Sequence, residues 1–184
     1  MSKKIAVLLS GNGSNLNAII NKGINVSFVV SNNPNAPGLI IAKKASIPTY
    51  TWKSLSVLEE EVSKLIIKHD IKLLVLAGFM RLLSKEFVNS LPLQFIINIH
   101  PSILPKFKGL NAIEQTLENC AQYTGVTVHY VDEGIDTGSI IQQEIITIYK
   151  NDTIKSLQKR LQALEHELYP RVIEKILSKK IYYY

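Results

Sequence analysis

A histidine preceded two positions earlier by an asparagine is the part of this sequence best suited to acid–base chemistry. The segment Asn98-Ile99-His100-Pro101-Ser102 follows an apolar run typical of a buried strand. If the strand continues, a period of two places the Asn98 amide and the His100 imidazole on one face, with Pro101 holding His100 extended. An amide stabilises a developing oxyanion, and an imidazole carries protons near neutral pH. Most lone histidines are structural, but a position at the carboxyl end of a strand favours catalysis.

An acidic turn, Val131-Asp132-Glu133-Gly134-Ile135-Asp136-Thr137-Gly138, joins two β-rich segments. Two interpretations fit it. It is a solvated hairpin loop, or it brings one of its carboxylates to His100. A carboxylate beside an imidazole favours the protonated ring and fixes its orientation.

A glycine-rich turn, Ser10-Gly11-Asn12-Gly13-Ser14-Asn15, lies between a predicted strand and a predicted helix. Backbone N–H groups in such a turn approach an anion closely, and the helix N-terminus adds positive charge, so phosphate is the expected ligand. Leu16 occupies the third glycine position of a dinucleotide-binding fingerprint, so that motif is incomplete. No Gly-Lys-Ser/Thr follows, so the turn is not a Walker phosphate-binding loop either. The alternative is a tight turn in which Ser14 or Asn15 is the helix N-cap.

A second unusual turn, Ala77-Gly78-Phe79-Met80-Arg81-Leu82-Leu83, leaves another predicted strand and combines apolar side chains with one arginine. Its backbone could pair with a flat heterocycle while Met80 and the leucines pack against the ring. The alternative is an ordinary strand-to-helix corner.

The elements that must position these turns alternate between strand and helix. Apolar runs predict strands, and amphipathic stretches with a stripe of leucine, valine and isoleucine predict helices. This alternation predicts a single-domain α/β fold with a doubly wound, mainly parallel, Rossmann-like sheet and antiparallel strands toward the C-terminal half. We expect strands at 5–9, 26–30, 47–51, 73–77, 95–99, 126–131 and 140–148, and helices at 14–21, 39–45, 55–69, 109–119 and after Asp152, which we expect to cap a last helix that Pro170 ends or kinks.

Composition narrows the class of protein. The 184 residues suit one domain, with a phosphate-binding half at about 1–75 and a catalytic, cofactor-binding half at about 76–184. The net charge of +6 suits anionic ligands, and no basic run exceeds two residues, so small ligands are favoured over nucleic acid. A single cysteine, Cys120, excludes an intramolecular disulfide and a cysteine-based zinc cluster in one chain. With no signal peptide or membrane span, we expect a cytoplasmic protein.

Four segments, in this order along the chain and at these spacings, resemble the phosphoribosylglycinamide formyltransferase family, the folate-dependent GAR transformylases of purine synthesis: residues 10–15, 77–81, 98–102 and 135–138. The resemblance runs from about Lys4 to Tyr169. It implies a Rossmann-like formyltransferase fold and the transfer of a formyl group from 10-formyltetrahydrofolate to the amine of 5′-phosphoribosylglycinamide. It also implies a cis peptide at Leu104-Pro105.

The resemblance carries roles onto residues of this chain, always by matching position. It implies a catalytic trio of Asn98, His100 and Asp136, with Pro101 and His129 in support. The remaining residues that it implies bind the substrate phosphate and ribose (Gly13, Ser14, Asn15, Gln162 and Glu165) or the folate (Met80, Arg81, Leu82, Leu83 and Asn98).

Some positions depart from the family pattern. Some bacterial members have an arginine before the fourth strand, whereas residues 53–61 contain none, and Asn111 and Ile113 fill a region where some members have a histidine. No role is assigned to the tyrosines at 182–184.

We expect no metal, because the four histidines lack metal-ligand spacing. The expected partners are the two small-molecule substrates, without nucleic acid or membrane, in a monomer or homodimer. One alternative is another folate-dependent formyltransferase, such as one acting on methionyl-tRNA, which would need a further RNA-binding domain for which we expect no room here. The other is a nucleotide-binding module without catalysis, against which the intact trio argues.

Overall fold

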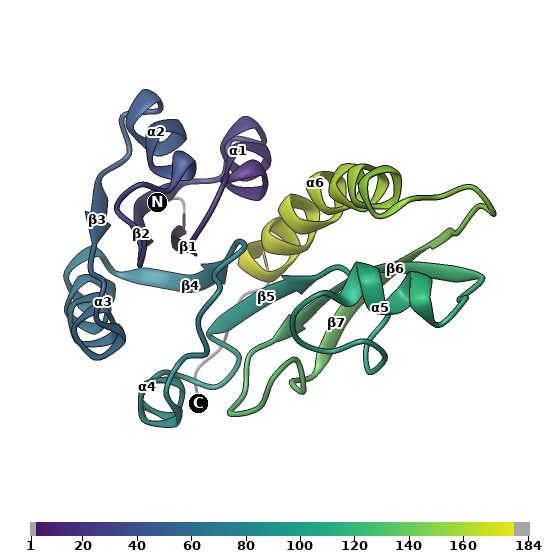
Figure 1. Ribbon diagram of the computed structural model, residues 1–184. Helices are drawn as coiled ribbons and strands as arrows, with labels where there is room; N and C mark the ends of the chain where they lie inside the picture. The colour runs from purple at the N-terminus through teal and green to yellow at the C-terminus, as the bar shows by residue number, and fades with distance from the viewer. Residues whose placement is uncertain (1–2, 179–184) are drawn as a thin grey trace.

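A seven-stranded sheet organises the chain, in a computed structural model that describes residues 3–178 (Figure 1). The strand order is β3-β2-β1-β4-β5-β6-β7. The first five strands are parallel, whereas β6 and β7 are antiparallel to their neighbours. The strands are β1 (Lys4–Leu9), β2 (Val26–Ser31), β3 (Thr49–Thr51), β4 (Ile71–Leu76), β5 (Ile96–His100), β6 (Tyr123–Tyr130) and β7 (Ile140–Thr147). The predicted α/β sheet with antiparallel C-terminal strands is confirmed.

Helices cover both faces of this sheet. The apolar residues of α1 (Ser14–Asn21), α2 (Pro37–Lys44) and α6 (Ile154–Ser178) share one buried cluster with alternate residues of β1, such as Val7. The apolar residues of α3 (Leu55–His69) and α4 (Lys85–Ser90) form the other cluster with the intervening β1 residues, such as Leu8. The short helix α5 (Ala112–Glu118) packs beside the first cluster. A strand buried on both faces explains why β1 reads as a continuous apolar run.

Three sequence-based expectations about helices were wrong or incomplete. Helix α5 begins at Ala112 rather than 109, because Gly109 and Asn111 both adopt positive φ, which a helix cannot contain. Helix α6 continues through Pro170, which is buried against the core, so packing outweighs the missing backbone donor. Asp152 does not cap that helix. Thr153 does, since its Oγ1 accepts a hydrogen bond from the Ser156 N–H.

Helix α4 was not predicted. The tyrosines at 182–184 lie outside the described residues. No helix within residues 3–178 is long and apolar enough to cross a bilayer.

The chain order reverses direction in the sheet between β1 and β4. The chain moves from β1 outward to β2 and β3, then returns to the other side of β1 to form β4 and β5. Such a reversal leaves a crevice beyond the carboxyl ends of the strands, where ligands of doubly wound sheets bind. The turns that follow β1, β4 and β5 all lie at that edge.

Candidate active site

The polar side chains predicted to act together lie close to one another. His100, at the end of β5, is only 5% exposed, and its Nδ1 lies 3.3 Å from Asp136 Oδ2. The other carboxylate oxygen, Oδ1, lies 3.4 Å from both the Asn98 Nδ2 and the His129 Nε2. The Gly109 N–H donates to Asp136 Oδ2 at 2.8 Å. One carboxylate therefore contacts all the other members of the cluster, and the loop interpretation that leaves it in solvent is wrong.

The second nitrogen of His100 has a partner that no residue type could reveal. His100 Nε2 lies 2.8 Å from the backbone carbonyl oxygen of Phe107. Both Phe107 (φ 54°) and Asp136 (φ 50°) adopt the left-handed conformation, which costs a non-glycine residue about 1–3 kcal/mol. The two acceptors of the imidazole are thus both held by strained backbone, as is common where geometry serves function.

Burial sets the ionisation of this cluster. Desolvation lowers the pKa of His100 below 6.5, and the proximity of His129 adds to this, although the Phe107 carbonyl and the Asp136 carboxylate oppose it. We expected Asp136 to raise the pKa of His100; it does act in that direction, but burial outweighs it. Burial also acts to raise the pKa of Asp136, yet hydrogen bonds from His129 and Gly109 and the charge of His100 hold it at about 2. The Asp136 carboxylate is therefore ionised at pH 7, while burial disfavours the charged form of the His100 ring beside it.

The glycine-rich turn after β1 contacts helix α6. Gly13 is the N-cap of α1 with φ 75°, and no side chain caps the helix, so the interpretation of Ser14 or Asn15 as N-cap is wrong. Instead, Asn15 Nδ2 donates to Glu165 Oε2 at 2.8 Å, and both side chains are buried. Burial raises the pKa of Glu165 above 4.5, and the bond from Asn15 opposes this rise. Half-buried Gln162 precedes Glu165 by one helical turn, so both side chains belong to one face of α6.

A buried tyrosine fixes α6 over the sheet. The Tyr169 hydroxyl donates to the carbonyl oxygens of Leu76 (2.8 Å) and Ile97 (3.2 Å), which belong to β4 and β5. This contact fixes the position of α6 on the sheet, and with it the position of Glu165, one helical turn earlier, beside the turn after β1.

The turn after β4 presents apolar side chains to solvent. Met80 is 64% exposed and Leu82 56% exposed, and Arg81 between them is exposed too, whereas Leu83 is buried in the core at 6%. Leu83 thus anchors the turn, and the other three side chains remain available to a ligand.

A single hydroxyl joins the turns after β1 and β4. Ser10 Oγ accepts a hydrogen bond from the Met80 N–H at 2.8 Å and donates to Asn32 Oδ1 at 2.6 Å. The two turns that were predicted to bind different ligands are therefore held in a fixed relation.

A cavity of about 560 Å³ lies on the same face of the sheet as Asn98 and His100. Ile96 of β5 lines it, and alternation along the strand places Ile96, Asn98 and His100 on one face. Val131 also lines it, two residues beyond His129 on the neighbouring chain segment. The remaining lining residues come from α4, the segment after it and the turn after β6 (Val88, Asn89, Leu91, Pro92, Leu93, Gln94, Phe95, Asp132, Glu133 and Gly134). This size and mixed lining suit an organic ligand with a flat ring.

Comparison with known proteins agrees with this geometry. The model of the formyl transferase family matches residues 3–173. The chain belongs to the formyl transferase family. It is 37% identical to the phosphoribosylglycinamide formyltransferase of Bacillus subtilis, covering 96% of this chain and 95% of that protein. It is also 41% identical to a trifunctional purine biosynthetic protein of Chironomus tentans, covering 96% of this chain but only 14% of that longer protein.

Solved structures give the same family. The crystal structure of phosphoribosylglycinamide formyltransferase from Anaplasma phagocytophilum superposes with a TM-score of 0.94 at 41% identity, covering 99% of this chain and 90% of that one. The corresponding enzyme from Bacillus halodurans has a TM-score of 0.92 at 38% identity, covering 99% and 100%. The Leu104-Pro105 peptide that the resemblance implied to be cis is cis here.

Some residues of this candidate site were not predicted from the sequence. Phe107 and Gly109 act through backbone atoms, so side-chain type gives no signal for them. Ser10 was read only as part of the glycine-rich turn. The cavity walls from α4 were missed together with that helix. Among residues 3–178, no group of three or more His, Cys, Asp or Glu side chains is placed to hold a metal ion.

The close approach of Gly13 to α2 yields a testable prediction. A Cβ on Gly13 would lie 2.5 Å from the Gly38 Cα, a backbone atom that cannot move aside, and φ is already 75°. We expect Gly13→Ala to lower the free energy of unfolding by about 2–4 kcal/mol, measured by urea denaturation. Gly23→Ala is the matched control, because Gly23 has φ 81° with nothing within 4 Å. Equal losses in the two variants would show that left-handed φ alone, not the contact with Gly38, sets the cost.

Proposed function

We propose that this chain transfers the formyl group of 10-formyltetrahydrofolate to the amine of 5′-phosphoribosylglycinamide, giving formylglycinamide ribonucleotide in purine biosynthesis. One observation carries the proposal. The cluster of Asn98, His100 and Asp136 lies at the edge of the sheet that also holds the glycine-rich turn after β1, and on the face that holds a cavity of about 560 Å³. The names of the full-length relatives support the same reaction.

Asn98 stabilises the transition state in the proposed reaction. The attacking amine adds to the formyl carbon, and the formyl oxygen gains negative charge as its double bond opens. Among the described residues, the Asn98 Nδ2 has only long contacts, at 3.4 Å, to Asp136 and His129, so an oxyanion can replace them. One such preorganised donor contributes about 3 kcal/mol to transition-state stabilisation.

His100 then handles the proton that the attacking amine loses. Burial shifts the pKa of His100 below 6.5, which favours the neutral ring that can accept a proton. Because Nε2 is engaged by the Phe107 carbonyl, we infer that substrate takes the place of this carbonyl when the site is loaded. The imidazolium formed is stabilised by Asp136, and its proton passes to the departing folate nitrogen.

The substrates occupy different parts of the site. Gly13, Ser14 and Asn15 bind the phosphate, and Gln162 and Glu165 reach the phosphate and ribose. The folate ring occupies the cavity between β5, β6 and α4, beside Met80, Arg81, Leu82 and Leu83. Pro101 and His129 support the catalytic trio. Residues 1–75 thus supply most of the phosphate site, and residues 76–184 the folate site and the chemistry.

A single assay tests the reaction. Purified protein is mixed with 5′-phosphoribosylglycinamide and 10-formyltetrahydrofolate, and the release of deformylated folate is followed by absorbance. We expect turnover only when both substrates are present. The absence of turnover with this pair, combined with activity toward another formyl acceptor, would overturn the substrate assignment.

The phosphate assignment is tested by Asn15→Ala. The variant loses an amide at the phosphate turn and leaves buried Glu165 without its donor, so we expect the KM for the phosphorylated substrate to rise about 10–100-fold. Exposed Asn17, on the same helix, provides the control Asn17→Ala, for which we expect an unchanged KM. An equal loss with a dephosphorylated analogue would remove Asn15 from phosphate binding.

A further inference from the structure

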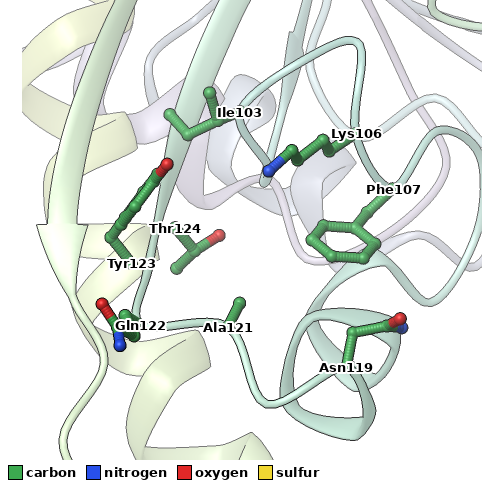
Figure 2. Close-up of a pocket in the computed structure, with 8 residues that line it drawn as sticks. All are labelled: Ile103, Lys106, Phe107, Asn119, Ala121, Gln122, Tyr123 and Thr124. Carbon is green, nitrogen blue, oxygen red and sulfur yellow. The ribbon is translucent and has the colours of Figure 1, made fainter.

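A second cavity of about 560 Å³ lies outside the two substrate sites proposed above (Figure 2). It is enclosed by the loop after β5, the segment that follows α5 and the start of β6. None of the residues to which we assign phosphate, ribose or folate binding lines it. Its volume is within the range of about 300–1,000 Å³ that is usual for small-molecule sites.

The lining of this cavity is cationic and polar. Lys106 lines it, no acidic residue does, and Lys106 makes no ion pair within the described part of the chain. The side-chain amides of Asn119 and Gln122 and the hydroxyl of Tyr123 are further hydrogen-bonding groups at its wall. Figure 2 shows the Lys106 amine directed into the enclosed space. The charge and donors favour an anion.

A buried hydroxyl lacks a partner at the same cavity. Thr124 is only 2% exposed, and its Oγ1 has no hydrogen-bond partner among residues 3–178. Figure 2 shows this oxygen facing the cavity, on the side of Lys106 and Phe107. Leaving a buried hydroxyl unsatisfied costs about 1–3 kcal/mol, so the position favours a ligand that supplies the missing partner.

The cavity also offers a flat apolar surface. The Phe107 ring and the Ile103 side chain also line it, next to Lys106. An aromatic face pairs well with another planar ring. We propose that this cavity binds a small organic anion that carries a planar ring, of the kind represented by a nucleoside 5′-monophosphate, with its anionic group on Lys106 and its ring against Phe107.

Such a ligand acts on the catalytic histidine through one residue. The side chain of Phe107 lines the cavity, while its carbonyl oxygen is the partner of His100 Nε2. The neighbouring Lys106 carbonyl accepts from Ser102 Oγ at 2.6 Å, which fixes the same loop to the end of β5. A ligand that holds Lys106 and Phe107 in place keeps His100 engaged and therefore lowers kcat. This effect on turnover, unlike the binding itself, rests on the proposed function.

Binding is measurable without any turnover. The chain's single cysteine, Cys120, is exposed and lies between the lining residues Asn119 and Ala121, so a trifluoromethyl label there reports on the cavity by ¹⁹F NMR. We expect adenosine 5′-monophosphate to shift the signal saturably, and adenosine or inorganic phosphate alone to bind at least tenfold more weakly. Lys106→Met should weaken binding of the nucleotide at least tenfold, and Thr124→Val should weaken it with the fold intact.

Two controls separate this cavity from the substrate phosphate site. Lys108→Met removes an exposed charge from the same loop without touching the lining, and Asn15→Ala weakens the phosphate turn; neither should change the ¹⁹F titration. In the enzyme assay, the nucleotide should lower kcat without raising the KM for 5′-phosphoribosylglycinamide. No saturable shift, full affinity in Lys106→Met, loss of affinity in Asn15→Ala, or purely competitive inhibition would each overturn the proposal. The NMR outcomes stand even if formyl transfer itself is not observed.

Discussion

Replacing His100 with alanine is expected to lower kcat about 10³-fold while the fold persists. Within the proposed catalytic trio of Asn98, His100 and Asp136, the imidazole is the group that can both accept and release a proton near pH 7, since the pKa of Asp136 is held at about 2. Asn98 and the substrate-binding residues remain in the variant, so KM values should change much less than kcat. Steady-state kinetics with both substrates, together with a thermal melt, measure the two effects separately.

A second histidine variant controls for the loss of a ring. His69 lies at the end of α3, against Phe28 with ring centroids 5.5 Å apart, on an element that contributes nothing to the proposed chemistry. We expect His69→Ala to change stability but to leave kcat near that of the unaltered protein. Near-normal kcat in His100→Ala, with melting unchanged, would remove His100 from the mechanism.

The parallel sheet was predictable because its strands are buried on both faces. Runs such as residues 5–9 contain no polar residue, which identifies a strand with helices on either side. Helix α4 was not predictable in the same way, since six residues are too few to show a helical period. The passage of α6 through Pro170 was also missed, because it depends on how strongly the helix packs on the sheet, and local sequence does not report this.

The candidate site divides along a similar line. Side chains with distinctive chemistry, such as Asn98 and His100, were found from their types, and the partner carboxylate was narrowed to Asp136 by the resemblance. Backbone partners leave no trace in residue types, so the Phe107 carbonyl could come only from coordinates. The direction of the His100 pKa was misjudged for a related reason: a neighbouring carboxylate is visible in a sequence, but the depth of burial that outweighs it is not.

The pH dependence of an Asp136 variant tests how the cluster sets the ionisation of His100. Burial lowers the pKa of His100, and His129 adds to this effect. The Phe107 carbonyl and Asp136 act to raise the pKa, but by less than burial and His129 lower it. Removing the carboxylate charge in Asp136→Asn therefore lowers the pKa of His100 further. If neutral His100 is the working form, kcat/KM of the unaltered protein falls as the pH drops through a value below 6.5, and this acidic limb lies at still lower pH in the variant.

The same substitution is expected to lower kcat/KM at pH 7 by about 10²–10⁴-fold, because the imidazolium formed during the reaction loses its counter-charge and the ring loses the partner at Nδ1. Asp70→Asn is the matched control. Asp70 is the exposed C-cap residue of α3 with φ 54°, a conformation that asparagine also adopts, and it lines neither of the proposed substrate sites. This control variant should change neither kcat/KM at pH 7 nor the pH at which kcat/KM falls on the acidic side. A limb in Asp136→Asn that stays fixed or moves to higher pH would mean that Asp136 does not control the charge of His100, because the loss of a nearby negative charge can only disfavour the protonated ring.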